Sequence, residues 1–166
     1  MRLLLVRHAI AADASEFHGR DEARPLTADG RRRFERGARA LAALEPELAL
    51  VLSSPLVRAR QTADLIAEAY VEPPQRGELA SLAPGGAPRE TLAALAKRRT
   101  LQAIALVGHE PSLSALEALL LTGSERSFAI FKKGGAALVD WIPGSAPGSS
   151  ALVWHLTAGQ LRDLAS

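Results

Sequence analysis

Residues 3–8 read Leu-Leu-Leu-Val-Arg-His, four apolar residues followed at once by an arginine and a histidine. Short apolar runs bounded by charge are typical of strands buried on both faces, which occur in parallel sheets covered by helices. Ligands of open α/β sheets bind beyond the carboxyl ends of the strands. We therefore expect Arg7 and His8 to stand at a ligand-binding edge where chemistry takes place.

Two further apolar runs, 48–52 and 104–107, are each followed by polar residues and then by a helical pattern. The last third has three strand-like runs, 128–131, 136–142 and 151–156, which indicate antiparallel hairpins. The sequence predicts an α/β fold with three α/β/α layers. Its sheet is mostly parallel with an antiparallel extension near the C-terminus, and residues 1–166 form a single domain.

Helix signals occur between these runs. Thr27 is a predicted N-cap with Phe34, Ala38, Leu41 and Leu44 facing the sheet, and Ser54 is the predicted cap of a second helix that continues towards Tyr70. Further helices are predicted over 90–98, over 111–121 with Gly123 as a left-handed cap, and after a capping box at Thr157 and Gln160. The stretch 76–88 is predicted to be an irregular surface loop.

Composition excludes several classes of protein. The 166 residues include no cysteine, which rules out disulfides, thiolate zinc sites and cysteine nucleophiles. No secretory signal is recognisable at the start, so we expect a soluble, cytoplasmic protein without a membrane partner. Aromatic residues make up 4% of the chain, which gives no stacking platform for nucleic acid.

Arginine dominates the basic residues. Of 20 Lys and Arg residues only three are lysines, Lys97, Lys132 and Lys133. Guanidinium groups suit phosphate recognition, although genomic base composition produces the same bias. The triplet Arg31-Arg32-Arg33 is interpreted as a solvated helix face.

Three separate segments deliver cationic or nucleophilic groups to strand ends. Arg7 and His8 follow the first strand, Arg58 lies one turn into the helix after the second, and His109 follows the run ending at Val107. Arginine forks can surround a transferring phosphoryl group without a metal, and a neutral imidazole can attack phosphorus and hold it covalently. No paired metal spacing occurs among the histidines, so neither a metal nor another cofactor is expected.

The three segments, residues 5–9, 54–63 and 107–111, resemble the signature segments of the histidine phosphatase (phosphoglycerate mutase-like) superfamily, and they occur in that family's order. The compact length and the stretch from Asp21 to Gly30 look most like its SixA-type phosphohistidine phosphatase branch. The resemblance implies that His8 is the nucleophile, that Arg7 and Arg58 hold the phosphate, and that His109 stabilises the transition state.

Two positions depart from the family pattern. Ala9 stands where relatives most often have glycine, and of the carboxylates only Glu78 matches the position of the general acid of many relatives. An imidazole leaving group is far less basic than an alkoxide and needs a proton donor less. A poorly defined acid therefore favours phosphohistidine as the substrate.

The expected function is phosphohistidine hydrolysis on a signalling or phosphorelay protein. The alternatives are a small-molecule phosphomonoesterase or mutase of the same superfamily, acting on a phosphorylated metabolite, and a catalytically silent phosphate-binding module. A dinucleotide-binding domain is disfavoured because no glycine fingerprint follows the first strand. His18 and His155 are interpreted as structural, with His155 at an exposed strand position.

Overall fold

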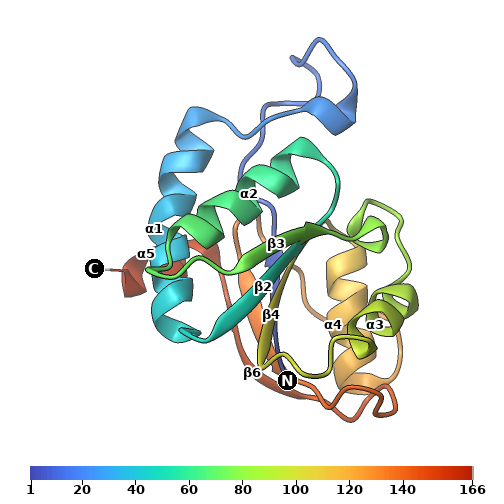
Figure 1. Ribbon diagram of the computed structural model, residues 1–166. Helices are drawn as coiled ribbons and strands as arrows, with labels where there is room; N and C mark the ends of the chain where they lie inside the picture. Colours follow the sequence, from blue (N-terminus) through green and yellow to red (C-terminus); the bar gives the residue numbers. More distant parts are fainter. Residues whose placement is uncertain (166) are drawn as a thin grey trace.

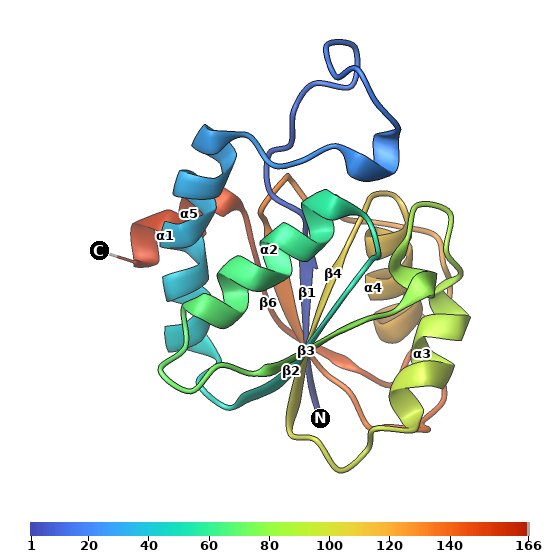
Figure 2. The ribbon, with the colours of Figure 1, turned by 45° about the horizontal axis from the view of Figure 1, so that its top comes forward.

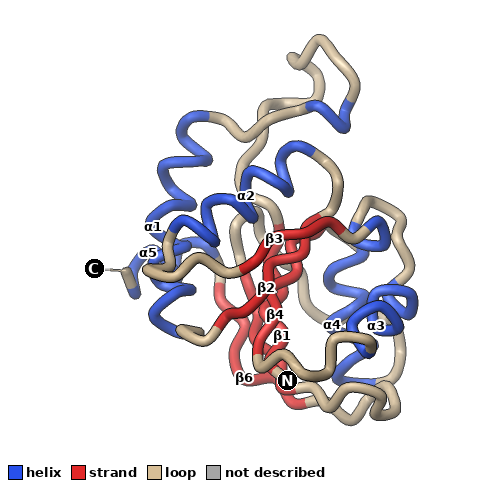
Figure 3. The backbone as a smooth tube through the Cα atoms, viewed as in Figure 1, coloured by secondary structure: helices blue, strands red, loops and turns tan. Residues whose placement is uncertain are grey.

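A six-stranded sheet forms the centre of the molecule, with the strand order β3-β2-β4-β1-β5-β6. The computed structural model describes residues 1–165, so Ser166, which the predicted domain includes, lies outside the described residues. Helices cover both faces of the sheet (Figures 1 and 3). The predicted three-layer α/β/α fold is confirmed.

The sheet is mostly parallel, as predicted. Strands β1 (Arg2–Arg7), β2 (Leu48–Ser53), β3 (Gln75–Glu78) and β4 (Ala103–Gly108) run in one direction. Strand β5 (Ala136–Asp140) is antiparallel to β1, and β6 (Ala151–Leu156) is antiparallel to β5. Because Arg7 pairs with Gly108 and Ser53 with Val107, the carboxyl ends of β1, β2 and β4 lie at one edge.

Five helices flank the sheet in the described part of the chain. One face carries α1 (Ala28–Leu44), α2 (Val57–Glu68) and α5 (Ala158–Leu164), and the other carries α3 (Pro88–Ala96) and α4 (Ser112–Thr122) (Figure 2). Two 3₁₀ turns, η1 (Asp21–Ala23) and η2 (Ala80–Leu82), lie in the connections. No helix among residues 1–165 is both long and apolar enough to cross a membrane.

Strand β1 supplies both hydrophobic cores. Successive side chains of a strand point to opposite faces of the sheet. Leu4 and Val6 accordingly join the cluster under α1 and α2, whereas Leu3 and Leu5 join the cluster under α4. All four are fully buried, which explains why this run contains no polar residue before Arg7.

Three predicted helix ends are confirmed. The Thr27 hydroxyl accepts a hydrogen bond from the Gly30 amide at the start of α1. Gly123 ends α4 with φ of 77°, in the left-handed region that glycine adopts without steric cost. Thr157 and Gln160 form the predicted capping box of α5.

Two predictions about local structure are wrong. Residues 76–78 do not belong to the predicted irregular loop but to β3 (Gln75–Glu78), whose polar residues suit a short edge strand in register with β2. Residues 128–131 are not a strand. The Phe131 amide donates to the Glu110 carboxylate and its carbonyl accepts from Arg7, so side chains take the bonds that a neighbouring strand would use.

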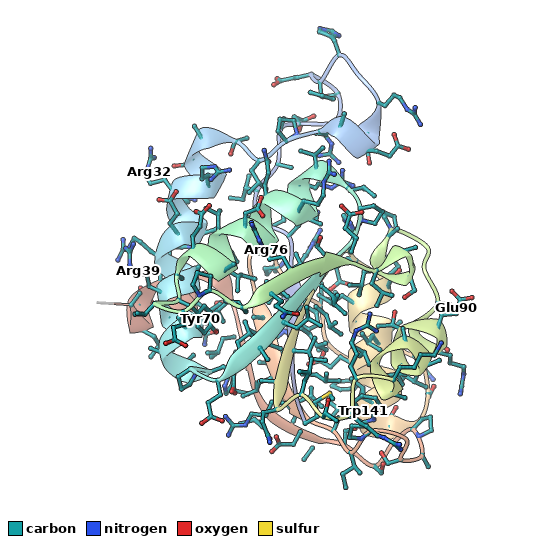
Figure 4. All side chains as sticks on the ribbon, in the orientation of Figure 1. Arg32, Arg39, Tyr70, Arg76, Glu90 and Trp141 are labelled. Atoms are coloured by element: carbon teal, nitrogen blue, oxygen red, sulfur yellow. The ribbon has the colours of Figure 1, made fainter. Side chains whose placement is uncertain are left out.

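The solvated face predicted for the arginine triplet of α1 agrees with the structure. Arg32 and Arg33 are exposed and pair with Asp29 within the same helix. Arg32 points away from the molecule (Figure 4). Arg39, which lies about two helical turns further along α1, does the same. Exposed pairs of this kind contribute little to stability.

Candidate active site

Two histidine rings meet where β1 and β4 end. His8 and His109 directly follow paired residues of the two strands, and their ring centroids are 4.9 Å apart with the planes tilted by 53°. Both side chains are buried. Arg58, the second residue of α2, and Arg7, the last residue of β1, are close enough for their charges to disfavour protonation of both rings. The four predicted residues therefore share one region of the structure.

The His8 ring is neutral and has one free nitrogen. Its Nδ1 lies 2.7 Å from the Ala9 carbonyl oxygen, and since a carbonyl can only accept, Nδ1 carries the proton. Burial lowers the His8 pKa to about 3, and the charges of Arg58 and Arg7 act in the same direction. The lone pair on Nε2 is thus available at neutral pH.

His109 contacts Ser54, a residue that the sequence predicts to be a helix cap. His109 Nε2 is 2.9 Å from the Ser54 hydroxyl, which also accepts a hydrogen bond from the Leu56 amide. The prediction that Ser54 caps α2 is wrong, because the helix begins at Val57 and the serine closes the turn before it. Burial, followed by the charge of Arg58, lowers the His109 pKa to about 4.

Arg58 is buried, and both of its Nη groups donate to Asp21. Its Nη1 donates to the Asp21 carbonyl at 2.8 Å and its Nη2 to the Asp21 carboxylate at 3.0 Å. Arg24 binds the same carboxylate, and this contact is the main reason why the pKa of Asp21 is lowered. The Nε of Arg58 is buried and has no hydrogen-bond partner.

Arg7 shows the same pattern. Its Nη1 donates to the Phe131 carbonyl at 2.6 Å, while its buried Nε has no partner. An unsatisfied buried donor is costly, and for a charged group the cost is larger. Two guanidinium N–H groups next to the His8–His109 pair are therefore ready to donate to an anion.

Thr62 connects the segment that follows His8 to the helix α2 that carries Arg58. Its hydroxyl accepts from the Ala9 amide at 3.1 Å and donates to the Arg58 carbonyl one helical turn earlier at 2.7 Å. The chain after His8 is thereby fixed to the helix that carries Arg58. No residue among 1–165 other than glycine has a positive φ, so Ala9 meets no backbone demand for glycine.

Glu110 anchors the segment that holds Arg7. Its carboxylate accepts from the Phe131 amide and from the Ser114 hydroxyl, each at 2.6 Å. The Phe131 backbone therefore forms hydrogen bonds with Glu110 through its amide and with Arg7 through its carbonyl. Glu110 thus links the start of α4 to the segment before β5.

Glu78 lies apart from these contacts. Its carboxylate is half exposed and pairs with Arg60 at 3.5 Å, and no hydrogen bond or ion pair in the described chain joins it to His8, Arg7, Arg58 or His109. It lines a hollow of about 530 Å³ between α2 and β3. Arg76, which Figure 4 labels beside α2, lines the same hollow and pairs with Asp64.

The other two histidines differ from each other. His18 is exposed in the loop before η1. The prediction of an exposed position for His155 is wrong: its Nδ1 is 2.8 Å from the carboxylate of the buried Glu117, and its ring lies 4.4 Å from that of Phe131. The contact with Phe131 and the bond to Glu117 explain why His155 is partly buried.

The lowered pKa values predict how stability depends on pH. His8 and His109 titrate near 3 and 4 in the folded protein and near 6.5 in the unfolded chain, so between these values the unfolded state binds more protons. Their contribution to stability is therefore complete above about pH 6.5 and is lost as the pH falls towards 4. Urea unfolding at pH 7 and pH 5 will measure this loss. The variant His8→Gln/His109→Gln should lose less stability than the wild type, and an equal loss would contradict the assignment.

The fold and the site define an α/β protein in which two buried, neutral histidines and two arginines cluster where β1 and β4 end. A profile of the histidine phosphatase superfamily (branch 1) matches residues 3–88. An uncharacterized protein of Picosynechococcus sp. is 36% identical over 138 residues, which are 81% of this chain and 82% of the relative. The chain belongs to the histidine phosphatase superfamily, and its general activity is that of a phosphatase.

Solved structures agree with this assignment. The protein histidine phosphatase SixA complexed with tungstate matches with a TM-score of 0.84 and 25% identity, covering 97% of this chain and 99% of that one. The alpha-ribazole phosphatase of Shigella flexneri matches with a TM-score of 0.71 and 19% identity, covering 95% and 97%. The second likeness shows the fold alone.

Proposed function

We propose that this protein is a metal-independent phosphatase that works through a covalent phosphohistidine on His8 and removes phosphate from a histidine of a signalling or phosphorelay protein. One observation carries the proposal: Arg7 and Arg58, whose buried Nε groups have no hydrogen-bond partner, lie close to two neutral histidine rings. Guanidinium donors of this kind bind phosphate oxygens strongly where water is excluded.

The first step is attack on phosphorus. The His8 Nε2 lone pair forms the new N–P bond, while the proton stays on Nδ1, which donates it to the Ala9 carbonyl and so fixes the direction of attack. Arg7, Arg58 and His109 donate to the phosphoryl oxygens as negative charge develops. The leaving group departs with the electrons of its former bond to phosphorus.

The second step returns the enzyme to its starting state. Water attacks the phosphohistidine, the Nε2–P bond breaks, and its electron pair returns to His8 as inorganic phosphate leaves. The proton from water goes to the phosphate product. Ser54 keeps the His109 ring in place through both steps by its 2.9 Å contact.

The proton requirement supports phosphohistidine as the substrate. A phosphoimidazole that is protonated on its second nitrogen leaves as neutral imidazole, whereas a sugar alkoxide needs a proton from the enzyme. The candidate acid Glu78 is bonded to Arg60 instead of a member of the pocket. Asp21 has a lowered pKa and its carboxylate is held by two arginines, so it is a poor proton donor. The likeness to SixA supports the same choice.

A substrate panel tests the proposal. Turnover of a phosphohistidine peptide is expected to exceed that of sugar and nucleotide phosphates by at least an order of magnitude in kcat/KM, because only the peptide provides a weakly basic leaving group. Phosphate release is the measurement. A preference for a sugar or nucleotide phosphate would replace the proposal by a small-molecule phosphomonoesterase, the activity that its alpha-ribazole phosphatase neighbour carries in its name.

A further inference from the structure

The segment between α4 and β5, which is bonded to Arg7 and His8, exposes apolar and cationic side chains. Phe128 is 59% exposed and Ile130 71% exposed. Arg126, Lys132 and Lys133 are exposed within the same eight residues. We propose that this segment, residues 126–133, is a docking loop for the protein that carries the phosphohistidine, and this inference rests on the proposed function.

The loop is fixed directly to the catalytic strand end. The Arg7 side chain donates to the Phe131 carbonyl, and the Arg7 amide donates to the Gly135 carbonyl at 3.0 Å. The Gly134 amide lies 3.1 Å from the carbonyls of both Arg7 and His8, with Gly134 at φ of 76°. Lys132 and Lys133 therefore belong to a turn that is bonded to the backbone of the proposed nucleophile.

A second anchor holds the loop from the other side. The Phe131 ring is fully buried and packs on His155, and its amide is bonded to Glu110. The side chains of Phe128 and Ile130, near this anchor, are exposed and belong to neither hydrophobic core cluster. A loop held rigidly in this way loses little conformational entropy when a partner covers it.

Charge indicates which partner fits. The loop holds two of the chain's three lysines and Arg126. Its neighbours with negative charge are Glu110, which accepts from the Phe131 amide, Glu125, which pairs with Arg89 at 3.5 Å, and Asp13, whose pKa is lowered first by its bonds to Ser15 and slightly by Lys133. The loop and its neighbours therefore carry an excess of positive charge, as does the nearby site with Arg7 and Arg58. The complementary partner is a protein with an acidic rim around an apolar patch next to its phosphorylated histidine.

The experiment compares one large and one small substrate. The large one is a histidine phosphotransfer domain of acidic surface, phosphorylated on its histidine with phosphoramidate, and the small one is free phosphohistidine. The double variant Phe128→Ser/Ile130→Ser should lower kcat/KM for the phosphorylated domain by at least about tenfold, because two exposed apolar contacts are lost. Turnover of free phosphohistidine should stay within about twofold, since neither residue is one of the proposed catalytic residues.

A matched control uses exposed apolar residues at the opposite edge. Val71 follows α2 and Ile142 follows β5, and both are at least as exposed as Phe128. The variant Val71→Ser/Ile142→Ser should turn over both substrates at wild-type rates. Lys132→Glu/Lys133→Glu should slow only the phosphorylated domain and should weaken the dependence of its rate on salt.

The outcomes separate the docking loop from the proposed function. If the wild type hydrolyses both substrates and the loop variant keeps full activity on the phosphorylated domain, the docking loop is wrong and the phosphohistidine activity stands. If the wild type hydrolyses neither substrate, the proposed function fails and the docking inference with it. If the loop variant differs from the wild type in oligomeric state by size-exclusion chromatography, the loop binds a second copy of the chain and the inference is overturned.

Discussion

Replacing His8 by alanine is expected to lower phosphatase turnover by a factor on the order of 10⁴ or more, because removal of a covalent nucleophile leaves only binding and charge stabilisation. The fold should persist, since His8 lies at the strand end beyond the fully buried residues 3–6. The readout is phosphate release together with circular dichroism. His18→Ala, at an exposed loop position, is the matched control and should behave as the wild type.

Covalent labelling makes the same experiment decisive. Wild-type protein incubated with a phosphodonor and quenched in alkaline SDS should carry phosphate, since phosphohistidine survives base, and His8→Ala should carry none. Label that persists in His8→Ala would place the nucleophile on another residue. Protection of the wild type against unfolding by phosphate without any label would indicate the silent phosphate-binding module instead.

The sequence predicts that Arg7, His8, Arg58 and His109 lie together because these residues are attached to the ends of strongly patterned elements. An all-apolar strand such as β1 has one plausible environment, and the residue after it must lie at the sheet edge. Arg58 and His109 follow from the same rule applied to β2 with α2 and to β4. The parallel register then brings the three segments together.

The contacts that position these groups could not be predicted in the same way. Glu110 meets Phe131 21 residues later, and Arg58 meets Asp21 37 residues earlier. Each contact joins a side chain to an irregular segment, so no periodic pattern marks it. The position of Ser54 before the second helix is equally compatible with a helix cap and with a hydrogen-bond partner of His109. Only the observed start of the helix distinguishes these two roles.

The predictions of a loop at residues 76–78 and of a strand at residues 128–131 are wrong for a related reason. Strand β3 has the polar sequence Gln-Arg-Gly-Glu and is a strand only because β2 offers it an open edge. Residues 128–131 have the composition of a strand, yet side chains of Glu110 and Arg7 bind the Phe131 backbone. In both places a distant partner decides the backbone conformation and overrides local propensity.

Substituting lysine for Arg58 is expected to lower kcat/KM by roughly 10²–10³-fold, which is the usual cost of losing one preorganised donor to a transition-state oxyanion. Arg58 uses Nη1 and Nη2 on Asp21, while its Nε has no partner and is the proposed donor to the anion. A lysine has a single ammonium group, which cannot hold Asp21 and donate to phosphate with the same geometry. The charge is kept while the fork is lost.

Arg60→Lys provides the control, because Arg60 lies two residues further along α2, is half exposed and pairs with Glu78. This variant should retain wild-type rates, since exposed ion pairs contribute little. Tungstate, the anion present in the SixA structure, offers a second readout: it should raise the thermal unfolding midpoint of the wild type and of Arg60→Lys more than that of Arg58→Lys. Near-normal turnover and full tungstate protection in Arg58→Lys would exclude Arg58 as an anion ligand, and the unpartnered Nε would then require a different explanation.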